Sequence, residues 1–438
     1  MSKQADYVLR TVEERGIRFV RLWFTDIQGF LKSVAITPAE LETAFEEGMA
    51  FDGSAIDGFS RVQEADMLAR PDPTTFQILP WRPSADGVAR MYCDIYTIDG
   101  EPFDGDPRHV LRRTLDSAKE MGYTPYVAPE LEYFYFTDSS NRREPLDRGG
   151  YFDLTPLDVA QEYRRESIIA LEQLGIPVEY SHHEVSPSQH EMDLRFTDAL
   201  TMADNILTAR LAVKEVALKH NIFASFMPKP REDFAGNAMH LHLSLFEGEH
   251  NAFYAPEGDL SSVAEHFIAG LLIHAREITA VTNQWVNSYK RLNGGFEAPS
   301  WATWGHNNES ALVRVPTAKR DKPDSVRVEY RAPDPACNPY LALAVILSAG
   351  LKGIRDEYVL DPEVSGNVTE IATHPDSKIQ HLPTTLSEAV DAMEQSALVR
   401  ETLGDHVFTW FIRNKRKEWI RYNQHVSGFE LDEYLPLL

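Results

Sequence analysis

The chain has 438 residues, enough for two or three domains with a large core. Hydrophobic residues make up 43% of it and aromatic residues 11%, which is typical of globular proteins and excludes a disordered or fibrous chain. Because 43 basic residues face 67 acidic ones, the net charge of −24 argues against binding to nucleic acid or to an anionic membrane surface.

The two cysteines, Cys93 and Cys337, lie far apart and predict neither a disulfide framework nor a zinc cluster. The first residues are charged and contain no apolar core of a signal peptide. The longest apolar run, 340–351, is too short to span a bilayer. We therefore expect a cytoplasmic protein without a membrane partner.

The first hundred residues predict a small β-rich domain. An amphipathic helix ends near Gly16, and two runs of β-branched and aromatic residues, 17–25 and 30–36, predict a hairpin. Further elements are expected as a short helix at 38–41 and strands at 76–81 and 90–98. The segment 101–106 is rich in Gly, Pro and Asp, so we place the boundary there, between an N-terminal domain of residues 1–105 and a catalytic domain of residues 106–438.

The larger domain alternates between the two kinds of periodicity. Apolar residues at helical spacing predict helices at 106–121, 156–174, 199–219, 261–282, 339–356 and 386–403. Strand-like runs occur at 123–137, 178–185, 189–196, 238–247, 310–315 and 326–331. The sequence contains no internal repeat, and the fold class is α+β.

Charged residues at alternating positions inside predicted strands are the most unusual feature of the sequence. Glu130 and Glu132 lie two apart in an apolar run and therefore share one face of a strand. Such a pair taken alone is more often a solvated strand face, because charged residues are usually exposed. Three further segments carry the same pattern, namely Glu184 and Glu191 around a Ser-Pro-Ser turn, His240, His242 and Ser244, and Arg327, Glu329 and Arg331.

These polar strand faces predict a metal-dependent site. Carboxylate ligands with a single imidazole favour Mg²⁺ or Mn²⁺ over zinc, and guanidinium groups match phosphate or carboxylate. The P-loop, the G-x-G-x-x-G turn, the G-x-S-x-G elbow and the H-E-x-x-H helix are all absent from the sequence. Two metals and several arginines without a P-loop predict phosphoryl transfer on a sheet surface.

Two loops carry further candidate acids. The glycine-rich segment 290–299 contains Glu297 and predicts a mobile flap, although an ordinary surface loop explains it equally well. Asp52 lies in a Gly-containing turn of the small domain.

Taken together, these segments resemble the glutamine synthetase family over nearly the whole chain. The resemblance rests on FDGSAIDGF at 51–59, PELEYF at 129–134, HHEVSPSQHE at 182–191, MHLHLS at 239–244, NSYKRL at 287–292, FEAP at 296–299 and RVEYRAPDPACNPY beginning at Arg327. It implies a β-grasp head and a catalytic domain whose antiparallel sheet lines the site. It also implies a dodecamer of two stacked hexameric rings, with each site between the head of one subunit and the body of the next.

The resemblance also implies a role for each motif residue. One metal would be held by Glu132, Glu184 and Glu191, and a second by Glu130, His240 and Glu329. Glutamate would bind Gly236, His240, Arg291 and Arg331, and the nucleotide would bind His242, Ser244, Arg314 and Arg327. The ammonium pocket would use Asp52 of the neighbouring subunit as proton acceptor, with Tyr151 and Glu184 beside it and Glu297 closing it. The catalytic residues would thus be Asp52, Glu297 and Arg314.

The implied reaction joins ammonia to the γ-carboxylate of glutamate. ATP would phosphorylate that carboxylate with the help of two or more Mg²⁺ or Mn²⁺ ions, and ammonia would then displace phosphate. Two alternatives remain open. The chain could be a γ-glutamyl-polyamine or other γ-glutamyl-amine ligase that takes an organic amine, or a weakly active or inactive homologue with a structural or regulatory role.

The sequence departs from the family pattern at three places. Glu309 stands where the pattern N-R-S-A has an arginine near the γ-phosphate, and this reversal of charge is the only support for an inactive homologue. Ala235-Gly236-Asn237 replaces the N-G-S of the glutamate loop, and Thr369 replaces the tyrosine that is adenylylated in enteric enzymes. The pattern resembles most the secondary synthetases of actinobacteria, some of which join glutamate to other amines.

Overall fold

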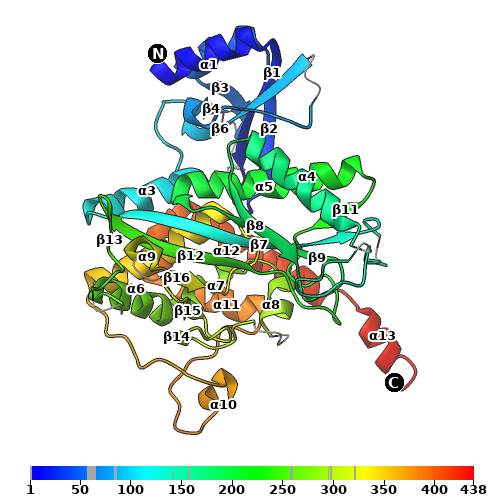
Figure 1. Ribbon diagram of the computed structural model, residues 1–438, viewed down its shortest axis with the longest axis vertical. Helices are drawn as coiled ribbons and strands as arrows, with labels where there is room; N and C mark the ends of the chain where they lie inside the picture. Colours follow the sequence, from blue (N-terminus) through cyan, green and yellow to red (C-terminus); the bar gives the residue numbers. More distant parts are fainter. Residues whose placement is uncertain are drawn as a thin grey trace.

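The computed structural model describes residues 2–56, 66–82, 86–140, 142–155, 158–256, 260–293, 295, 298–319 and 322–438. A small β-rich head stands at one end of the long axis, above a larger body in which helices surround a sheet (Figure 1). The α+β class predicted from the sequence is therefore confirmed. No helix in these ranges is long and apolar enough to cross a membrane.

The head is a sheet with two helices packed against it. Its strands run in the order β2-β1-β6-β4-β3 and are β1 (Ile17–Thr25), β2 (Leu31–Ile36), β3 (Met49–Asp52), β4 (Asp66–Pro71) and β6 (Gly87–Thr97). The predicted hairpin is confirmed, because β1 and β2 pair antiparallel. Helix α1 (Lys3–Glu14) begins at Ser2, whose side chain accepts a hydrogen bond from the Ala5 amide. The strand predicted at 76–81 is only β5 (Gln77–Ile78), since Pro80 cannot donate to a sheet.

The sheet of the body is the surface on which the candidate residues lie. Its strands run in the order β14-β15-β16-β12-β7-β9-β8, and the short strands β10 (Thr197–Asp198), β11 (Phe223–Ser225) and β13 (His250–Asn251) flank it. The main strands are β7 (Thr124–Phe136), β8 (Val178–His183), β9 (Gln189–Leu194), β12 (Met239–Glu247), β14 (Trp304–His306), β15 (Val313–Val315) and β16 (Val328–Tyr330). The sheet is antiparallel as expected, except that β14 and β15 pair parallel.

Helices cover the sheet, and α9 (Pro339–Arg355) lies in the core. The others in the body are α3 (Pro107–Glu120), α4 (Ala160–Gln173), α5 (Ala199–Lys219), α6 (Ser262–Ile273), α7 (Ala275–Thr282), α8 (Val286–Leu292), α10 (Val368–Ala372), α11 (Leu386–Glu394), α12 (Ala397–Asn423) and α13 (Gly428–Tyr434). The head adds α2 (Leu41–Glu46). The helix predicted at 261–282 is two helices that meet at His274. The helix predicted at 386–403 also breaks, because Ser396 caps a new one.

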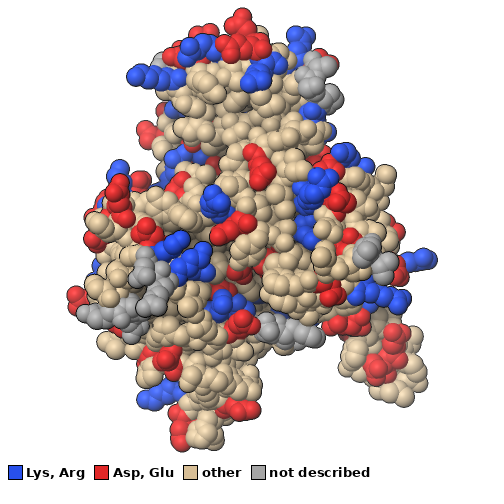
Figure 2. All heavy atoms as spheres, in the orientation of Figure 1, with Lys and Arg blue, Asp and Glu red and all other residues tan. Residues whose placement is uncertain are grey.

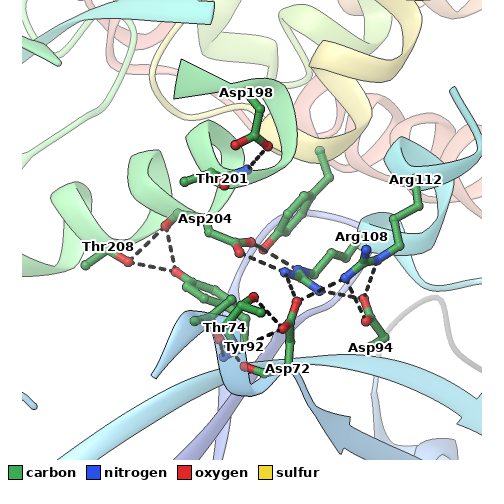
Figure 3. Close-up of polar contacts among 12 residues, drawn as sticks. Asp72, Thr74, Tyr92, Asp94, Arg108, Arg112, Asp198, Thr201, Asp204 and Thr208 are labelled. Carbon is green, nitrogen blue, oxygen red and sulfur yellow. Dashed lines mark hydrogen bonds and ion pairs between the residues drawn. The ribbon is translucent and has the colours of Figure 1, made fainter. Parts of the chain in front are cut away.

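A buried ionic network joins the head to the body. Arg108 on α3 contacts Asp72 at 3.0 Å and Asp94 at 2.7 Å in the head, and Asp204 on α5 at 2.9 Å. Arg112 bonds the two head carboxylates as well, and Figure 3 shows both guanidinium groups between them. A buried guanidinium needs such partners to offset its loss of hydration, so the network fixes the head on α3 and α5.

Candidate active site

Cross-strand pairing brings the predicted strand residues together on one face of the sheet. Glu130 on β7 lies opposite His240 on β12, and Glu132 lies opposite Glu191 on β9. His242 lies opposite Glu329 on β16, and His182 on β8 lies opposite Glu191. Directly opposite residues of an antiparallel pair point to the same face, so carboxylates and imidazoles from β7, β8, β9, β12 and β16 converge.

Glu130 is an anion held by two imidazoles. Its two oxygens lie 2.9 Å from Nδ1 of His240 and 2.6 Å from Nε2 of His242. Burial opposes ionisation, but these two hydrogen bonds hold the pKa of Glu130 well below its ordinary value. Glu329 beside it is fully buried, bonds Arg331 at 2.5 Å and also bonds Arg314.

Glu132, on the same strand face, has a raised pKa, in contrast to Glu130. One of its oxygens accepts hydrogen bonds from the Ala238 amide at 2.8 Å and from Nε2 of Gln189 at 3.1 Å. Burial and then the neighbouring Glu184 raise the pKa of Glu132 to about 8. Burial and Glu130 raise the pKa of Glu191 as well. Without a cation, this end of the site therefore holds protons at neutral pH.

Two groups of side chains on this face fit divalent cations. Their ligand atoms lie within 4.8 Å of one another, and the groups are Glu130, His242 and Glu329, and His182, Glu184 and Glu191. Neighbouring carboxylates repel one another and so raise one another's pKa, and a bound cation removes this repulsion in place of a proton. Oxygen ligands with one imidazole suit Mg²⁺ or Mn²⁺. The clusters differ in detail from the sets implied by the resemblance, because His242 and His182 belong to them and His240 and Glu132 lie beside them.

His182 is the residue that the sequence analysis missed. Its Nε2 lies 3.1 Å from Glu191 and its Nδ1 lies 3.5 Å from Glu184. The signal was present, because in a hairpin with a turn at 184–188 the residue two positions before the turn, His182, faces Glu191 across the strands.

A cavity of about 120 Å³ opens between this face and the segment after α8. It is lined by Glu132, Glu184, Val185, Gln189, Ala235, Gly236, Ala238, His240, Arg291, Gly295, Ala298 and Arg331. All four residues expected to bind glutamate are in this lining. Gly236 leaves no room for a side chain, because a Cβ there would lie 2.6 Å from the Pro228 carbonyl oxygen and 2.7 Å from Cγ of Arg291.

The two arginines of the cavity differ in what they offer an anion. Arg291 donates to the backbone carbonyls of Arg331 at 3.0 Å, Ala332 at 2.6 Å and Pro333 at 3.1 Å, so it braces the chain that follows β16. Arg331 bonds Glu329, and its buried Nε has no hydrogen-bond partner among the described residues. Because buried donors are normally paired, the Nε of Arg331 fits a carboxylate in the cavity.

The residues expected at the nucleotide lie on β12, β15 and the segment before β16. Nε of Arg327 donates to Nδ1 of His242 at 3.2 Å, and Ser244 follows two residues later on β12. Arg314 on β15 bonds Glu329, and its buried Nε is likewise unpartnered in the described part of the chain. The exposed Glu309 lies close enough to act on Arg314. Burial lowers the pKa of Arg314, but Glu329 and then Glu309 raise it above its ordinary value.

Tyr151 borders the group of His182, Glu184 and Glu191, whereas Asp52 does not. The exposed ring of Tyr151 stacks on Phe152 at 4.2 Å and meets His182 edge-on at 5.4 Å. Burial, then Glu184, Glu191 and Glu309 raise the pKa of Tyr151. Asp52 is the last residue of strand β3, and its Oδ1 accepts a hydrogen bond from the Ser54 amide at 2.9 Å. Strand β3 lies in the head, apart from the body sheet that carries the clusters (Figure 1). Glu297 lies outside the described residues.

Comparisons with known proteins agree on one family. Residues 104–434 match the family model "Glutamine synthetase, catalytic domain", and residues 16–98 match "Glutamine synthetase, beta-Grasp domain". Proteins named glutamine synthetase from Mycolicibacterium smegmatis and Mycobacterium tuberculosis are 57% and 55% identical to this chain, over the full length of both sequences. Among solved structures, a GmaS/ADP complex has a TM-score of 0.90 at 31% identity and covers 100% of both chains. Plasmodium falciparum glutamine synthetase has a TM-score of 0.91 at 25% identity and covers 99%.

Proposed function

The chain belongs to the glutamine synthetase family, and we propose that it is a glutamate–ammonia ligase that makes glutamine from glutamate, ATP and ammonia. The expected family and the β-grasp head on an α+β fold are both confirmed by the family models. The observation that carries the proposal is the sheet face itself. It carries two carboxylate–imidazole clusters and the Nε donors of Arg314 and Arg331, which are unpartnered among the described residues, and Glu184 and Arg331 also line the cavity.

Different residues of the chain bind glutamate and the nucleotide. Arg331, His240 and Gly236 bind and orient glutamate in the cavity, while Arg291 holds the backbone after β16 so that Arg331 keeps its place. Arg314, Arg327, His242 and Ser244 bind the nucleotide phosphates and sugar along β12 and β15. The two clusters would hold divalent cations, which we propose to be Mg²⁺ or Mn²⁺, with Glu132 as a further ligand once it has lost its proton. Such cations would supply positive charge that offsets the charge on the transferred phosphoryl group.

We assign the ammonia side of the site to Tyr151, Glu184 and the neighbouring subunit's copy of Asp52. Within one chain Asp52 lies in the head while Tyr151 borders the clusters, so a site that uses both needs two subunits. A carboxylate near an anionic pocket attracts ammonium and can accept its proton, which leaves ammonia free to attack. Glu297 would then close the pocket and exclude water.

The C-terminal segment supports a stacked-ring assembly. Helix α13 projects from the body at the lower right of Figure 1, and acidic side chains gather on it in Figure 2. Apolar side chains of α13 and of the residues after it are exposed as well, with Phe429 at 65%, Leu435 at 75% and Leu438 at 101%. An apolar, acidic tail that leaves its own body needs another surface to cover it.

A surface that could bind this C-terminal segment lies near the C-terminal end of α12, where Glu418 and Tyr422 line a cavity. This cavity of about 820 Å³ is lined mainly by apolar side chains, including Leu211 on α5, Phe226 directly after β11, Trp285 directly before α8 and Phe30 in the head hairpin. Lys214 and Lys290 also line it and complement the acidic tail. We propose that this cavity receives the tail of a second copy, and that such exchange joins two hexameric rings into a dodecamer.

Product analysis of the purified protein tests the proposed function. Phosphate release and glutamine formation are measured with ATP, Mg²⁺ and glutamate, and ammonium is compared with methylamine and putrescine. We expect ammonium to give the highest kcat/KM, and a higher value for an organic amine would show that the chain is a γ-glutamyl-amine ligase. Glu184→Ala should abolish the activity and weaken cation binding, whereas Glu162→Ala on the exposed side of α4 should change neither.

A further inference from the structure

The reverse face of the β8–β9 hairpin carries a second polar cluster directly behind the cation site. Alternation along the strands puts His183 and His190 on the opposite face from His182 and Glu191. The His183 side chain is completely buried. Its Nδ1 lies 2.7 Å from the carbonyl oxygen of Glu184, and its Nε2 lies 3.0 Å from Oδ1 of Asp147.

Asp147 ties a separate loop to this hairpin. Besides His183, its Oδ1 accepts hydrogen bonds from the amides of Gly149 at 3.0 Å and Ser188 at 2.9 Å. The amide of Phe152 donates to the carbonyl oxygen of His183 at 3.1 Å. The contact is tight, because a Cβ on Gly149 would lie 2.6 Å from Nε2 of His183. The loop that ends in Tyr151 and Phe152 is thus bound at both ends to His183.

The cluster is not arranged to hold a metal ion. Ligand atoms of Asp147, His183 and His190 lie within 4.8 Å of one another, which is compatible with a cation. However, both ring nitrogens of His183 face acceptors, so both carry protons and neither offers a lone pair. Arg164 lies 2.7 Å from Nδ1 of His190 and donates to it, which leaves the proton of His190 on Nε2. Only the carboxylate could bind a metal, and the cluster therefore serves another purpose.

We infer that Asp147 and His183 are positioning residues that hold the cation ligand Glu184 and the ammonia-side residue Tyr151 in a fixed relation. The inference rests on the proposed function for the role of Tyr151. His183 fixes the backbone of Glu184 through one ring nitrogen and the Tyr151 loop through the other, so the two sides of the pocket share one anchor. Loss of the anchor lets Glu184 and Tyr151 move apart while the nucleotide residues on β12 and β15 stay in place.

Two substitutions of Asp147 test the anchor in the full-length protein. Asp147→Ala removes all three hydrogen bonds, and outer partners of metal ligands are typically worth ~10–100-fold in metal affinity or activity. We expect Mn²⁺ binding, measured by calorimetry without substrates, to weaken by about this factor, and the KM for ammonium to rise while the KM for ATP stays within about 2-fold. Asp147→Asn is nearly isosteric, keeps the acceptor for both amides and lets a neutral His183 keep one of its two bonds, so it should fold normally and fall between wild type and the alanine variant.

Asp106→Asn is the matched control, because Asp106 is an equally buried carboxylate that accepts from two backbone amides but lies at the head–body junction. It should leave Mn²⁺ affinity and the KM for ammonium unchanged. An Asp147→Asn protein with wild-type values of both quantities overturns the inference, whatever the alanine variant does. A parallel rise in the KM for ATP also overturns it, since that shows general loosening. If the wild type makes no glutamine, the proposed function fails, and the Mn²⁺ measurement still decides the anchoring of Glu184.

Discussion

Replacing Glu132 with glutamine should stabilise the cation-free protein. The glutamine oxygen can take the place of the one carboxylate oxygen that accepts from Ala238 and Gln189, so no hydrogen bond is lost. The change removes a carboxyl whose pKa burial and Glu184 raise from 4.5 to about 8. A carboxyl with a raised folded-state pKa contributes stability that is complete below its unfolded pKa and is lost as pH rises toward the folded one.

The size of the effect follows from that window. Each pKa unit corresponds to about 1.36 kcal/mol, so the wild type loses up to about 4 kcal/mol between about pH 4.5 and pH 8 through this group. Glu132→Gln removes the loss, and its free energy of unfolding should exceed that of wild type by up to about 4 kcal/mol at about pH 8 and by much less at about pH 5. Denaturant unfolding in EDTA at the two pH values measures the difference.

Glu130→Gln is the control, because we expect it to lower the free energy of unfolding of the cation-free protein. Both oxygens of Glu130 bond imidazoles, and hydrogen bonds to a charged group are worth about 1.5–3 kcal/mol, so this variant should be less stable than wild type without cation. Excess Mn²⁺ should raise the stability of wild type by binding only the folded state, and Glu132→Gln should lose most of that increase. If Glu132→Gln destabilises the EDTA-treated protein at about pH 8, the protonated state assigned to Glu132 is wrong.

Four further outcomes are expected. The affinity for Mn²⁺ should increase by up to tenfold per unit from about pH 6 to pH 8, because a proton must leave Glu132 when the cation binds, and a flat calorimetric profile would contradict this. Rings co-assembled from Asp52→Ala and Glu297→Ala subunits should regain partial activity, whereas inactive mixed rings would rule out shared sites. Glu309→Arg should raise kcat by up to ~10²-fold, with Glu309→Gln in between, since a carboxylate near Arg314 is replaced by a cation facing phosphate; identical rates would place Glu309 outside the site. Removing residues 425–438 should separate the proposed dodecamer into single hexameric rings, so that light scattering gives half the mass of the full-length assembly. An unchanged mass would rule out tail exchange.

The strands of the site could be predicted because their chemistry follows the period of two. Glu130 with Glu132 and His240 with His242 alternate with apolar residues in sequence, and the structure places each pair on one face. Helix ends were harder to predict where apolar residues continue across a break. Apolar residues continue at helical spacing through 261–282, and nothing in this run marks the break between the two helices at His274.

The hydrogen bonds that hold the site residues in place could not be predicted from sequence, because they join segments that are distant in the chain. Arg291 belongs to a recognisable motif, yet its guanidinium bonds carbonyls 40 or more positions away. Asp147 lies in an irregular loop, and its partner His183 is 36 residues further along. A pattern within one strand shows which face a side chain is on, but it does not show which loop packs against that face.

The two faces of the β8–β9 hairpin explain why the motif at 182–191 contains so many titratable residues. His182 and Glu191 face the cavity side, where carboxylates compete for protons or cations. His183 and His190 face the opposite side, where Asp147 and Arg164 bind them. The proposed cation ligand Glu184 must keep its position whether protons or a cation occupy the site, and the buried Asp147–His183 pair behind it provides a fixed point for its backbone. The same ten residues therefore carry both the reactive groups and the groups that hold them.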